Sequence, residues 1–328
     1  MRKVRGQRSE VGALRGAALL GAVLASACVG PTDDPSQVHD LRVLAAQAEP
    51  PELQATSCSN DPIAQIPFLR PVKVSWLIAD PAGEGRELTY TVTACANVND
   101  RKCENENDFI ELAAGTTQAG VLEHSFFLVG EFKQGEFRPL LLPDEVPLLQ
   151  ETISQDTYKG LGGVRIPLVL RIQGGDEIIY AQKLMVLSCK FFADQKPNTN
   201  PAFAGFTLDG QEWGENTVRT LSGDAPFVVE PIDFADREEP YIVPSFSLEP
   251  VYLQEAWKVA WHATAGQFSS SETGGVDFAG EGERHRNEWA LRAEEKDEGI
   301  ERDITFTFVA RDGRGGISWA ERKAKWVP

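Results

Sequence analysis

Short runs of β-branched and aromatic residues recur along the chain, and Gly, Pro, Asn or Asp separates each run from the next. Runs of this length, with alternating apolar and polar residues, are typical of the strands of β-sandwiches and barrels. The clearest hairpin joins residues 164–172 to residues 178–187 through the two glycines at 174–175. The pattern therefore predicts an all-β fold.

A polar segment rich in structure-breaking residues, Gln195–Pro201, interrupts this pattern. Alternation stops after Leu187 and restarts at Phe203. Proline and asparagine disfavour both helix and central strand, so the segment indicates a domain boundary. We expect two β-sandwich domains, at residues 38–196 and 197–328. The competing picture is one large sandwich whose strands are exchanged across this segment.

Several finer elements can be assigned from the same signals. The stretch 281–302 is heavily charged and is expected to be a solvated loop, broken by a short inward-facing strand at Trp289–Leu291. One short helix is expected between Asp144 and Tyr158, with Asp144 as its cap. Further strands are expected at residues 41–46, 72–78, 88–93, 124–129, 202–208, 245–248, 253–263 and 304–310.

The N-terminus has the three parts of a secretory signal. Five basic residues and one acidic residue occupy the first fifteen positions, and a small, apolar stretch follows at residues 16–27. A bilayer-spanning helix needs about 18 or more apolar residues, and this run is shorter. The alternative is an N-terminal membrane anchor that is never cut.

The sequence Leu-Ala-Ser-Ala-Cys at residues 24–28 resembles the lipobox of bacterial lipoproteins. The family prefers Leu three places before the cysteine, where this chain has Ala25, so ordinary cleavage nearby stays open. The resemblance implies that residues 1–27 are a signal peptide, that Cys28 carries lipid and that residues 28–37 are a flexible tether. One acyl chain binds a membrane only marginally, whereas three hold firmly. The expected location is therefore the cell envelope, on the outer membrane, with the membrane as a partner through the N-terminal lipid.

Four cysteines remain if Cys28 is lipidated, and an even number in an oxidising compartment favours two disulfides. Cys95 and Cys103 bracket a short polar loop and are expected to pair, which leaves Cys58 to pair with Cys189. The alternative is free buried thiols. Zinc is not indicated, because the chain has no Cys-x-x-Cys and no histidine near these cysteines.

The chain is acidic, with a formal net charge of −17, and removal of the signal residues makes the mature chain −21. A surface of this sign repels phosphate backbones, so we expect no nucleic-acid partner. An unknown envelope protein or a polysaccharide is the partner class that remains.

Two end motifs are distinctive. The mature chain opens with His-Asp-Leu-Arg-Val-Leu-Ala-Ala at residues 39–46 and closes with Val-Ala-Arg-Asp-Gly-Arg-Gly-Gly-Ile-Ser-Trp at residues 309–319. In these motifs the chain resembles uncharacterised lipoproteins abundant in myxobacteria, over most of its mature length. The closing module also resembles immunoglobulin-like, cadherin-like and PKD-like sandwiches. The resemblance implies surface display and β-sandwich modules, and it supplies no activity or site residues.

Known catalytic motifs are absent from the sequence. There is no Gly-x-Ser-x-Gly, no His-Glu-x-x-His and no phosphate-binding glycine loop, and we expect no cofactor. The expected function is a non-enzymatic binding or structural module displayed from a membrane. The alternatives are a carbohydrate-binding surface protein, or an extracellular hydrolase whose paired carboxylates meet only in the fold.

Calcium is the weak remaining candidate, because it prefers carboxylate and amide oxygens. Asp100, Glu104 and Asp108 lie in a loop dense in such groups, and a second acidic stretch spans residues 230–239. Neither matches an EF-hand, so a solvated acidic loop is the favoured interpretation and no metal site is predicted. Seven tryptophans raise the possibility of sugar stacking, but most lie in apolar strand patterns and are expected in the core.

Overall fold

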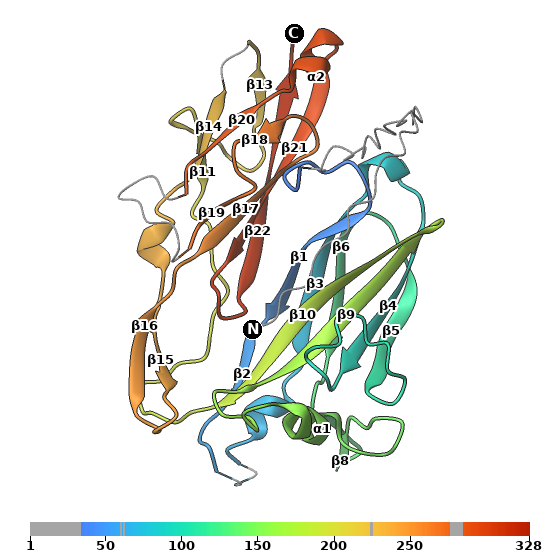
Figure 1. Ribbon diagram of the computed structural model, residues 1–328, viewed down its shortest axis with the longest axis vertical. Helices are drawn as coiled ribbons and strands as arrows, with labels where there is room; N and C mark the ends of the chain where they lie inside the picture. The colour runs from blue at the N-terminus through green and yellow to red at the C-terminus, as the bar shows by residue number, and fades with distance from the viewer. Residues whose placement is uncertain (1–33, 60, 62, 224–225, 276–284) are drawn as a thin grey trace, which may run out of the picture. The chain divides into compact units, whose positions relative to one another are not determined.

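The structure is a computed structural model that describes residues 34–328 except 60, 62, 224–225 and 276–284 (Figure 1). The predicted signal peptide and the lipidation candidate Cys28 lie outside the described residues. Strands are the dominant regular elements of the described part, and the all-β prediction is confirmed.

The first half contains a three-stranded and a five-stranded sheet, in the orders β1-β3-β6 and β2-β10-β9-β4-β5, and a separate hairpin of β7 and β8. Short 3-10 turns lie at Ile66–Leu69 and Pro81–Gly83. The elements are β1 (Arg42–Glu49), β2 (Glu52–Ala55), β3 (Val72–Ala79), β4 (Leu88–Cys95), β5 (Phe109–Thr117), β6 (Gly120–Phe126), β7 (Gly130–Lys133), β8 (Glu136–Pro139), α1 (Leu148–Gln155), β9 (Val164–Gly174) and β10 (Glu177–Cys189).

These two sheets pack face to face because alternate side chains of each strand are apolar. Trp76 of β3 is fully buried and meets Val92 of β4 and Leu170 of β9 in one core cluster. Each such side chain stabilises the fold by about 1.5–3 kcal/mol when it leaves water. The β9–β10 hairpin is present as predicted, with Glu177 opposite Gly174 and Gly175 at a φ of 62°.

The second half contains two five-stranded sheets, β12-β11-β14-β20-β18 and β13-β22-β21-β17-β19, and a two-stranded hairpin of β15 and β16. A 3-10 turn lies at Ala235–Arg237. The elements are β11 (Phe206–Leu208), β12 (Gln211–Glu212), β13 (Val218–Leu221), β14 (Phe227–Pro231), β15 (Pro240–Pro244), β16 (Pro250–Gln254), β17 (Lys258–Ala263), β18 (Gln267–Phe268), β19 (Glu272–Gly274), β20 (Asn287–Ala290), α2 (Ala293–Asp297), β21 (Arg302–Arg311) and β22 (Ile317–Trp326).

An aromatic core fills this second sandwich. Trp213, Trp261 and Trp289 are fully buried, and their rings pack at steep angles against Phe306 and Phe308. Each indole N–H has an acceptor, such as the Thr273 hydroxyl at 2.9 Å from Nε1 of Trp261. Most of the tryptophans are therefore core residues, as expected, and do not form an exposed sugar-stacking surface.

Two expectations for strands in the second half are wrong. Residues 245–248 form a tight turn between β15 and β16, in which the Leu248 N–H donates to the Ser245 carbonyl at 2.9 Å. Leu248 has a φ of 62°, a left-handed conformation that strands exclude. The single strand expected at 253–263 is instead the end of β16 and the whole of β17, separated by three residues that include the buried Glu255.

The helix expected between Asp144 and Tyr158 is present as α1, but Asp144 is not its cap. The helix begins at Leu148, and Pro147 is its N-cap residue. The Asp144 carboxylate instead accepts a hydrogen bond from the Val146 N–H at 3.3 Å. The charged stretch 281–302 contains β20, with Trp289 buried as expected, and also the short helix α2.

Side chains of both halves meet in a further apolar cluster. Val38, Leu44 and Leu77 from the first half pack against Ala260 and Val309 from the second. The backbone also crosses between the halves, because the Val38 N–H donates to the Ala263 carbonyl at 2.9 Å and the Ala263 N–H donates to the Ser36 carbonyl at 2.8 Å. The two halves therefore share an apolar cluster and backbone hydrogen bonds.

We expect the whole chain to unfold in a single calorimetric transition, because opening the junction exposes this apolar cluster in both halves. A fragment of residues 198–328, which the sequence predicts to fold alone, should melt at a lower temperature than the whole chain. Two well-separated transitions in the whole chain would contradict the coupling. A fragment that is soluble only with the first half present would contradict independent folding.

His262 on β17 gives the structure a pH dependence. Burial lowers the pKa of His262 to about 4. A hydrogen bond between Nδ1 and the Pro35 carbonyl, at 3.2 Å, acts in the opposite direction and raises this pKa. The folded pKa is depressed, so between about pH 6.5 and 4 the unfolded chain binds more protons than the folded one. Stability is therefore lost as the pH falls through that window, by about 3 kcal/mol from this residue over the whole window.

Urea unfolding at neutral pH and near pH 4.5 checks this prediction. Relative to the wild type, His262→Asn should lose less stability on acidification. His39→Asn is the matched control, because it makes the same substitution at an exposed histidine. Equal pH dependence of the His262→Asn variant and the wild type would contradict the assignment.

Candidate ligand-binding groove

A groove of about 680 Å³ lies between the loop that follows β10 and the β15–β16 hairpin. We call it the junction groove. Its loop wall contains Lys190 and Lys196, its hairpin wall contains Tyr241 and Tyr252, and Arg314 reaches it from the turn between β21 and β22. The volume falls within the range of about 300–1,000 Å³ that is typical of ligand sites.

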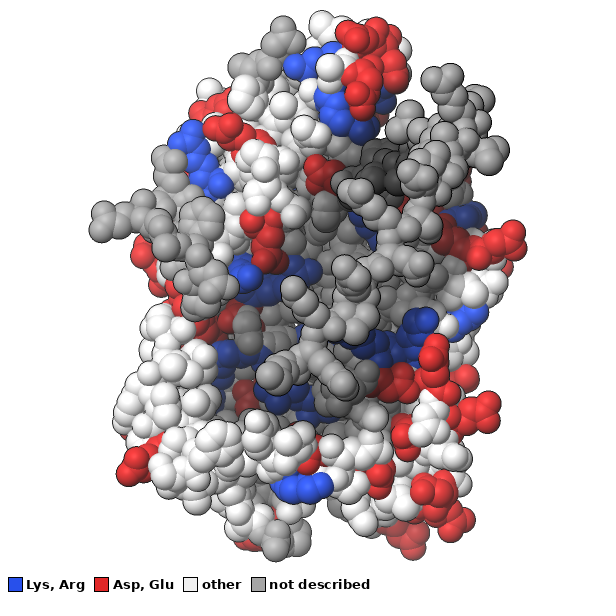
Figure 2. All heavy atoms as spheres, viewed as in Figure 1, with Lys and Arg blue, Asp and Glu red and all other residues white. Residues whose placement is uncertain are grey.

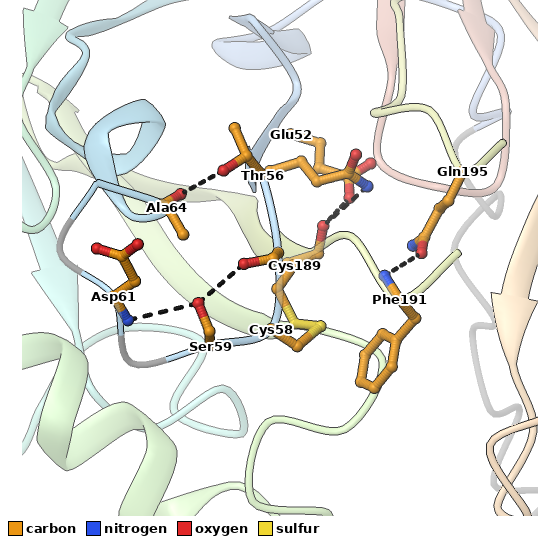
Figure 3. The surroundings of a disulfide bond; sticks show 12 residues. Glu52, Thr56, Cys58, Ser59, Asp61, Ala64, Cys189, Phe191 and Gln195 are labelled. Carbon is orange, nitrogen blue, oxygen red and sulfur yellow. Dashed lines mark hydrogen bonds between the residues drawn. A yellow bond between two sulfur atoms is a disulfide. The ribbon is translucent and has the colours of Figure 1, made fainter. Parts of the chain in front are cut away.

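A disulfide holds the start of the loop wall (Figure 3). Cys189, the last residue of β10, is bonded to Cys58, with 5.0 Å between the two Cα atoms. The next residue, Lys190, donates its backbone N–H to the Ala55 carbonyl at 3.0 Å, which extends the parallel pairing of β2 with β10. The Gln195 side chain then accepts a hydrogen bond from the Phe191 N–H at 2.8 Å. The loop is therefore fixed at its base and braced internally.

Arg314 is fixed by contacts on several sides. Its Nη1 lies 2.9 Å from a Glu255 carboxylate oxygen, and its Nη2 lies 3.8 Å from Glu52. The guanidinium also lies over the ring of Tyr241, at 4.4 Å from the centroid. Such a cation–π contact holds the ring in place. Tyr241 is thus presented to the groove in one orientation.

The turn that carries Arg314 is organised by one buried carboxylate. Asp312 accepts hydrogen bonds from the backbone N–H groups of Arg314, Gly315 and Gly316, at 2.7, 3.0 and 2.9 Å. The glycines are required: Gly313 has a φ of 79°, and a Cβ on Gly316 would clash with the Asp312 carboxylate. The buried Asp312 carboxylate is therefore the anchor of this turn.

Residues from the first half and from the linker complete this anchor. The Asn198 amide donates to Asp312 at 2.6 Å, and Asn198 is itself buried. The buried Lys183 of β10 donates its ammonium to the Gly315 carbonyl. Burial lowers the pKa of Lys183 to about 8, and the charge of Asp312 partly opposes this shift. Burial also raises the pKa of Asp312. The groove therefore rests on a buried polar network that involves both halves.

The hairpin wall exposes apolar side chains. Phe246 and Tyr252 are 79% and 74% exposed, and Leu253 is also exposed. Phe246 at the tip meets the ring of Tyr158, which follows α1, at a centroid distance of 5.5 Å. Figure 2 shows that the surface over β15 and β16 is largely free of charged side chains. Contiguous exposed apolar surface of this kind marks binding surfaces more often than ordinary exterior.

Glu239 aligns the hairpin with the linker. Its side chain accepts a hydrogen bond from the Thr199 hydroxyl at 3.0 Å, and its backbone N–H donates to Glu255 at 3.1 Å. On the other side of the linker is a second hollow of about 450 Å³, lined by Glu52, Arg70 and residues 197–200. The linker is therefore a packed partition between two hollows rather than a loose connection.

The groove contains basic groups that lack a carboxylate partner. Among the residues that the structure describes, neither Lys190 nor Lys196 makes an ion pair, whereas Arg314 is paired. Basic side chains also gather along the middle of the face shown in Figure 2. In a chain of net charge −17, two unpaired cations beside one groove favour an anionic ligand there.

Of the weak calcium candidates, Asp100 lies in the loop closed by the second disulfide, Cys95–Cys103, whose Cα atoms are 5.8 Å apart, and Glu104 and Asp108 follow that loop. Asp100 accepts the Glu104 N–H at 2.8 Å, and Asp108 accepts the Asn105 amide at 2.6 Å. These carboxylates serve the loop itself. Within the described residues, no three His, Cys, Asp or Glu side chains are grouped to hold a metal ion. In the other acidic stretch, Glu238 and Glu239 accept hydrogen bonds from Trp257 and Thr199.

Both disulfides expected from the sequence are therefore present, but the junction groove was not foreseen. Its residues come from four separate parts of the chain, within 190–199, 239–242, 252–253 and at Arg314. The available signal was the pair of proline-bounded segments, Pro-Tyr-Ile-Val-Pro at 240–244 and Pro-Val-Tyr-Leu at 250–253. Two short β-rich segments with prolines at their ends indicate an exposed hairpin with protected edges.

No protein-family model matches the chain, and no curated protein matches its sequence. In the described residues, no helix is both long and apolar enough to span a bilayer. Three solved structures illustrate the distant similarity. Escherichia coli alpha-2-macroglobulin activated by porcine elastase is 10% identical over 89% of this chain, with a TM-score of 0.24, and this chain spans 22% of it.

The other two are from Porphyromonas gingivalis. A protein of unknown function from strain W83 is 12% identical, with a TM-score of 0.20, over 86% of this chain and 99% of that one. Dimeric latent PorU is 12% identical, with a TM-score of 0.21, over 89% of this chain and 24% of that one. Likeness at these TM-scores carries no argument about function. The resemblance to myxobacterial lipoproteins stays an expectation from the sequence.

Removing the Cys58–Cys189 disulfide should destabilise the protein more than removing Cys95–Cys103. The first closes a separation of 131 residues and the second a separation of 8. The entropy of the unfolded chain then predicts that the free energy of unfolding falls by about 4–5 kcal/mol without Cys58–Cys189 and by about 2–3 kcal/mol without Cys95–Cys103. Urea unfolding of the two double-serine variants measures both. Faster proteolysis between residues 190 and 199 should accompany only the first, and equal proteolysis of the two variants would contradict its role in the groove wall.

Proposed function

We propose that the protein is a lipid-anchored, non-enzymatic binding protein of the cell envelope and that the junction groove is its ligand-binding surface. The single observation that carries the proposal is a pre-formed groove whose walls expose Tyr252 and two unpaired lysines. The proposed anchor is Cys28, through the lipobox-like sequence at residues 24–28.

Two features support a location of the protein outside the cytoplasm. Cys58–Cys189 and Cys95–Cys103 are disulfides, and such bonds persist mainly in oxidising compartments. The basic and apolar N-terminus has the form of an export signal. The lipid anchor and the outer membrane remain parts of the proposal, because they depend on the N-terminal sequence alone.

Binding is favoured over catalysis by the state of the groove's polar groups. Arg314 and Glu239 are already held by other side chains, so they position the walls instead of standing ready to react. The alternative, a hydrolase with paired carboxylates, depends on Asp194 and Glu239, which both line the groove. Hydrolysis of a bound ligand that stops in Asp194→Asn or Glu239→Gln would favour that alternative.

A photo-crosslinking residue placed at Tyr252 tests both the membrane location of the protein and the junction groove as its binding surface. In native cells, the membrane fraction should contain a crosslinked adduct, because Tyr252 is exposed on the groove wall. The Cys28→Ala variant should leave the membrane fraction, or stay unprocessed, and lose the adduct. The matched control places the same residue at Lys323, which is exposed on β22 away from the groove. Adducts of equal yield at both positions, or a membrane-bound and correctly processed Cys28→Ala variant, would contradict the proposal.

A further inference from the structure

The junction groove combines three chemical features that belong to one class of ligand. It is lined by Tyr241 and Tyr252, by Lys190 and Lys196, and by Asp194. We propose that it binds an oligosaccharide that carries carboxylate groups. Tyr252 would stack on a sugar ring, and the two lysines would pair with sugar carboxylates. This inference rests on the proposed function and names the ligand class for the same groove.

The ring surfaces carry the first step. A pyranose has flat patches of C–H groups and a polar rim, so it binds where an aromatic face stands beside hydrogen-bonding side chains. Tyr252 is 74% exposed on the groove wall, and Arg314 holds Tyr241 at 4.4 Å from its ring centroid. The tryptophans that would otherwise provide such faces are mostly buried in the cores. Arg314 covers one face of Tyr241, and Tyr241 and Tyr252 lie on opposite faces of the hairpin, so Tyr252 is the stacking surface proposed for this groove.

The unpaired lysines of the groove support an anionic ligand. Lys190 and Lys196 have no ion-pair partner in the described part of the chain, although acidic residues outnumber basic ones 49 to 32. An ammonium that stays unpaired in so acidic a protein is free to pair with an incoming anion. Asp194 on the same wall can accept sugar hydroxyl groups. A neutral sugar would leave both lysines without a role.

The edges of the hairpin argue against an acidic peptide. Extended peptides bind mainly by adding a strand to an open sheet edge, through backbone hydrogen bonds. Here β15 begins and ends with Pro240 and Pro244, and β16 begins with Pro250. Proline has no N–H to donate, and prolines at strand edges protect them against strand addition. Side-chain recognition of a sugar does not need these donors.

Calorimetric titration of the whole mature chain tests the proposal. The probes are a tetramer of galacturonate, its fully methyl-esterified form and a tetraglutamate peptide. We expect the galacturonate tetramer to bind, and to bind more weakly as salt is raised, because the pairing is between exposed charges. The methyl ester keeps the rings and removes the charges, so it should bind at least tenfold more weakly.

Variants separate the two contributions. Lys190→Ala with Lys196→Ala should weaken binding about tenfold, as expected for two exposed ion pairs. Tyr252→Ala should weaken binding about tenfold, whereas Tyr252→Phe keeps the ring face and should stay within about twofold. The control pair, Lys323→Ala with Arg101→Ala, removes the same charge away from the groove and should change binding by less than about twofold. Circular dichroism spectra and melting temperatures show that each variant is folded.

Three outcomes would overturn the proposal. Equal binding of the methyl ester would remove the role of the carboxylates. Binding of tetraglutamate as tight as that of the tetramer would assign the groove to acidic peptides. Absence of binding by all three probes would reject the ligand class. The crosslinking experiment at Tyr252 judges the proposed function separately, so a specific adduct without galacturonate binding would reject only the inference.

Discussion

The buried carboxylate of Asp312 is the constraint on which the groove depends. A carboxylate removed from water without partners costs several kcal/mol, and here three backbone N–H groups and the Asn198 amide supply those partners. The turn can adopt this arrangement because Gly313 and Gly315 accept positive φ. Its conformation in turn places Arg314 against Tyr241. One buried charge thus sets the positions of Arg314 and Tyr241 in the groove.

The same network makes the groove rigid before any ligand arrives. Lys183 from β10 and Asn198 from the linker reach the turn from different parts of the chain. The Cys58–Cys189 disulfide fixes the start of the opposite wall. Walls whose backbone is already held in place lose less conformational entropy on binding, so weak individual contacts to a ligand add up to useful affinity. The residues that hold the walls, such as Cys189, therefore lie next to those proposed to contact the ligand, such as Lys190.

Local sequence signals predicted local features well. The glycines at 174–175 marked the β9–β10 hairpin, and the nine-residue span from Cys95 to Cys103 marked a local disulfide. Residues 245–248 were predicted as a strand because Phe and Leu alternate with Ser there, yet the flanking prolines and the left-handed Leu248 make a turn. The groove could not be predicted at all. It joins residues as distant as Lys190 and Arg314, and only tertiary packing brings them together.

The start of the described chain links the proposed anchor to both halves. Residues 36–38 pair with β17 of the second half, and the chain then enters β1 of the first half. Val38 packs in the apolar cluster that contains side chains of both halves. In a lipid-anchored protein, a pull on the tether would therefore be opposed by this pairing and by the cluster, and would not fall on one sandwich alone. A body displayed from a membrane needs its junction to withstand such force, because the groove exists only while the two halves remain in contact.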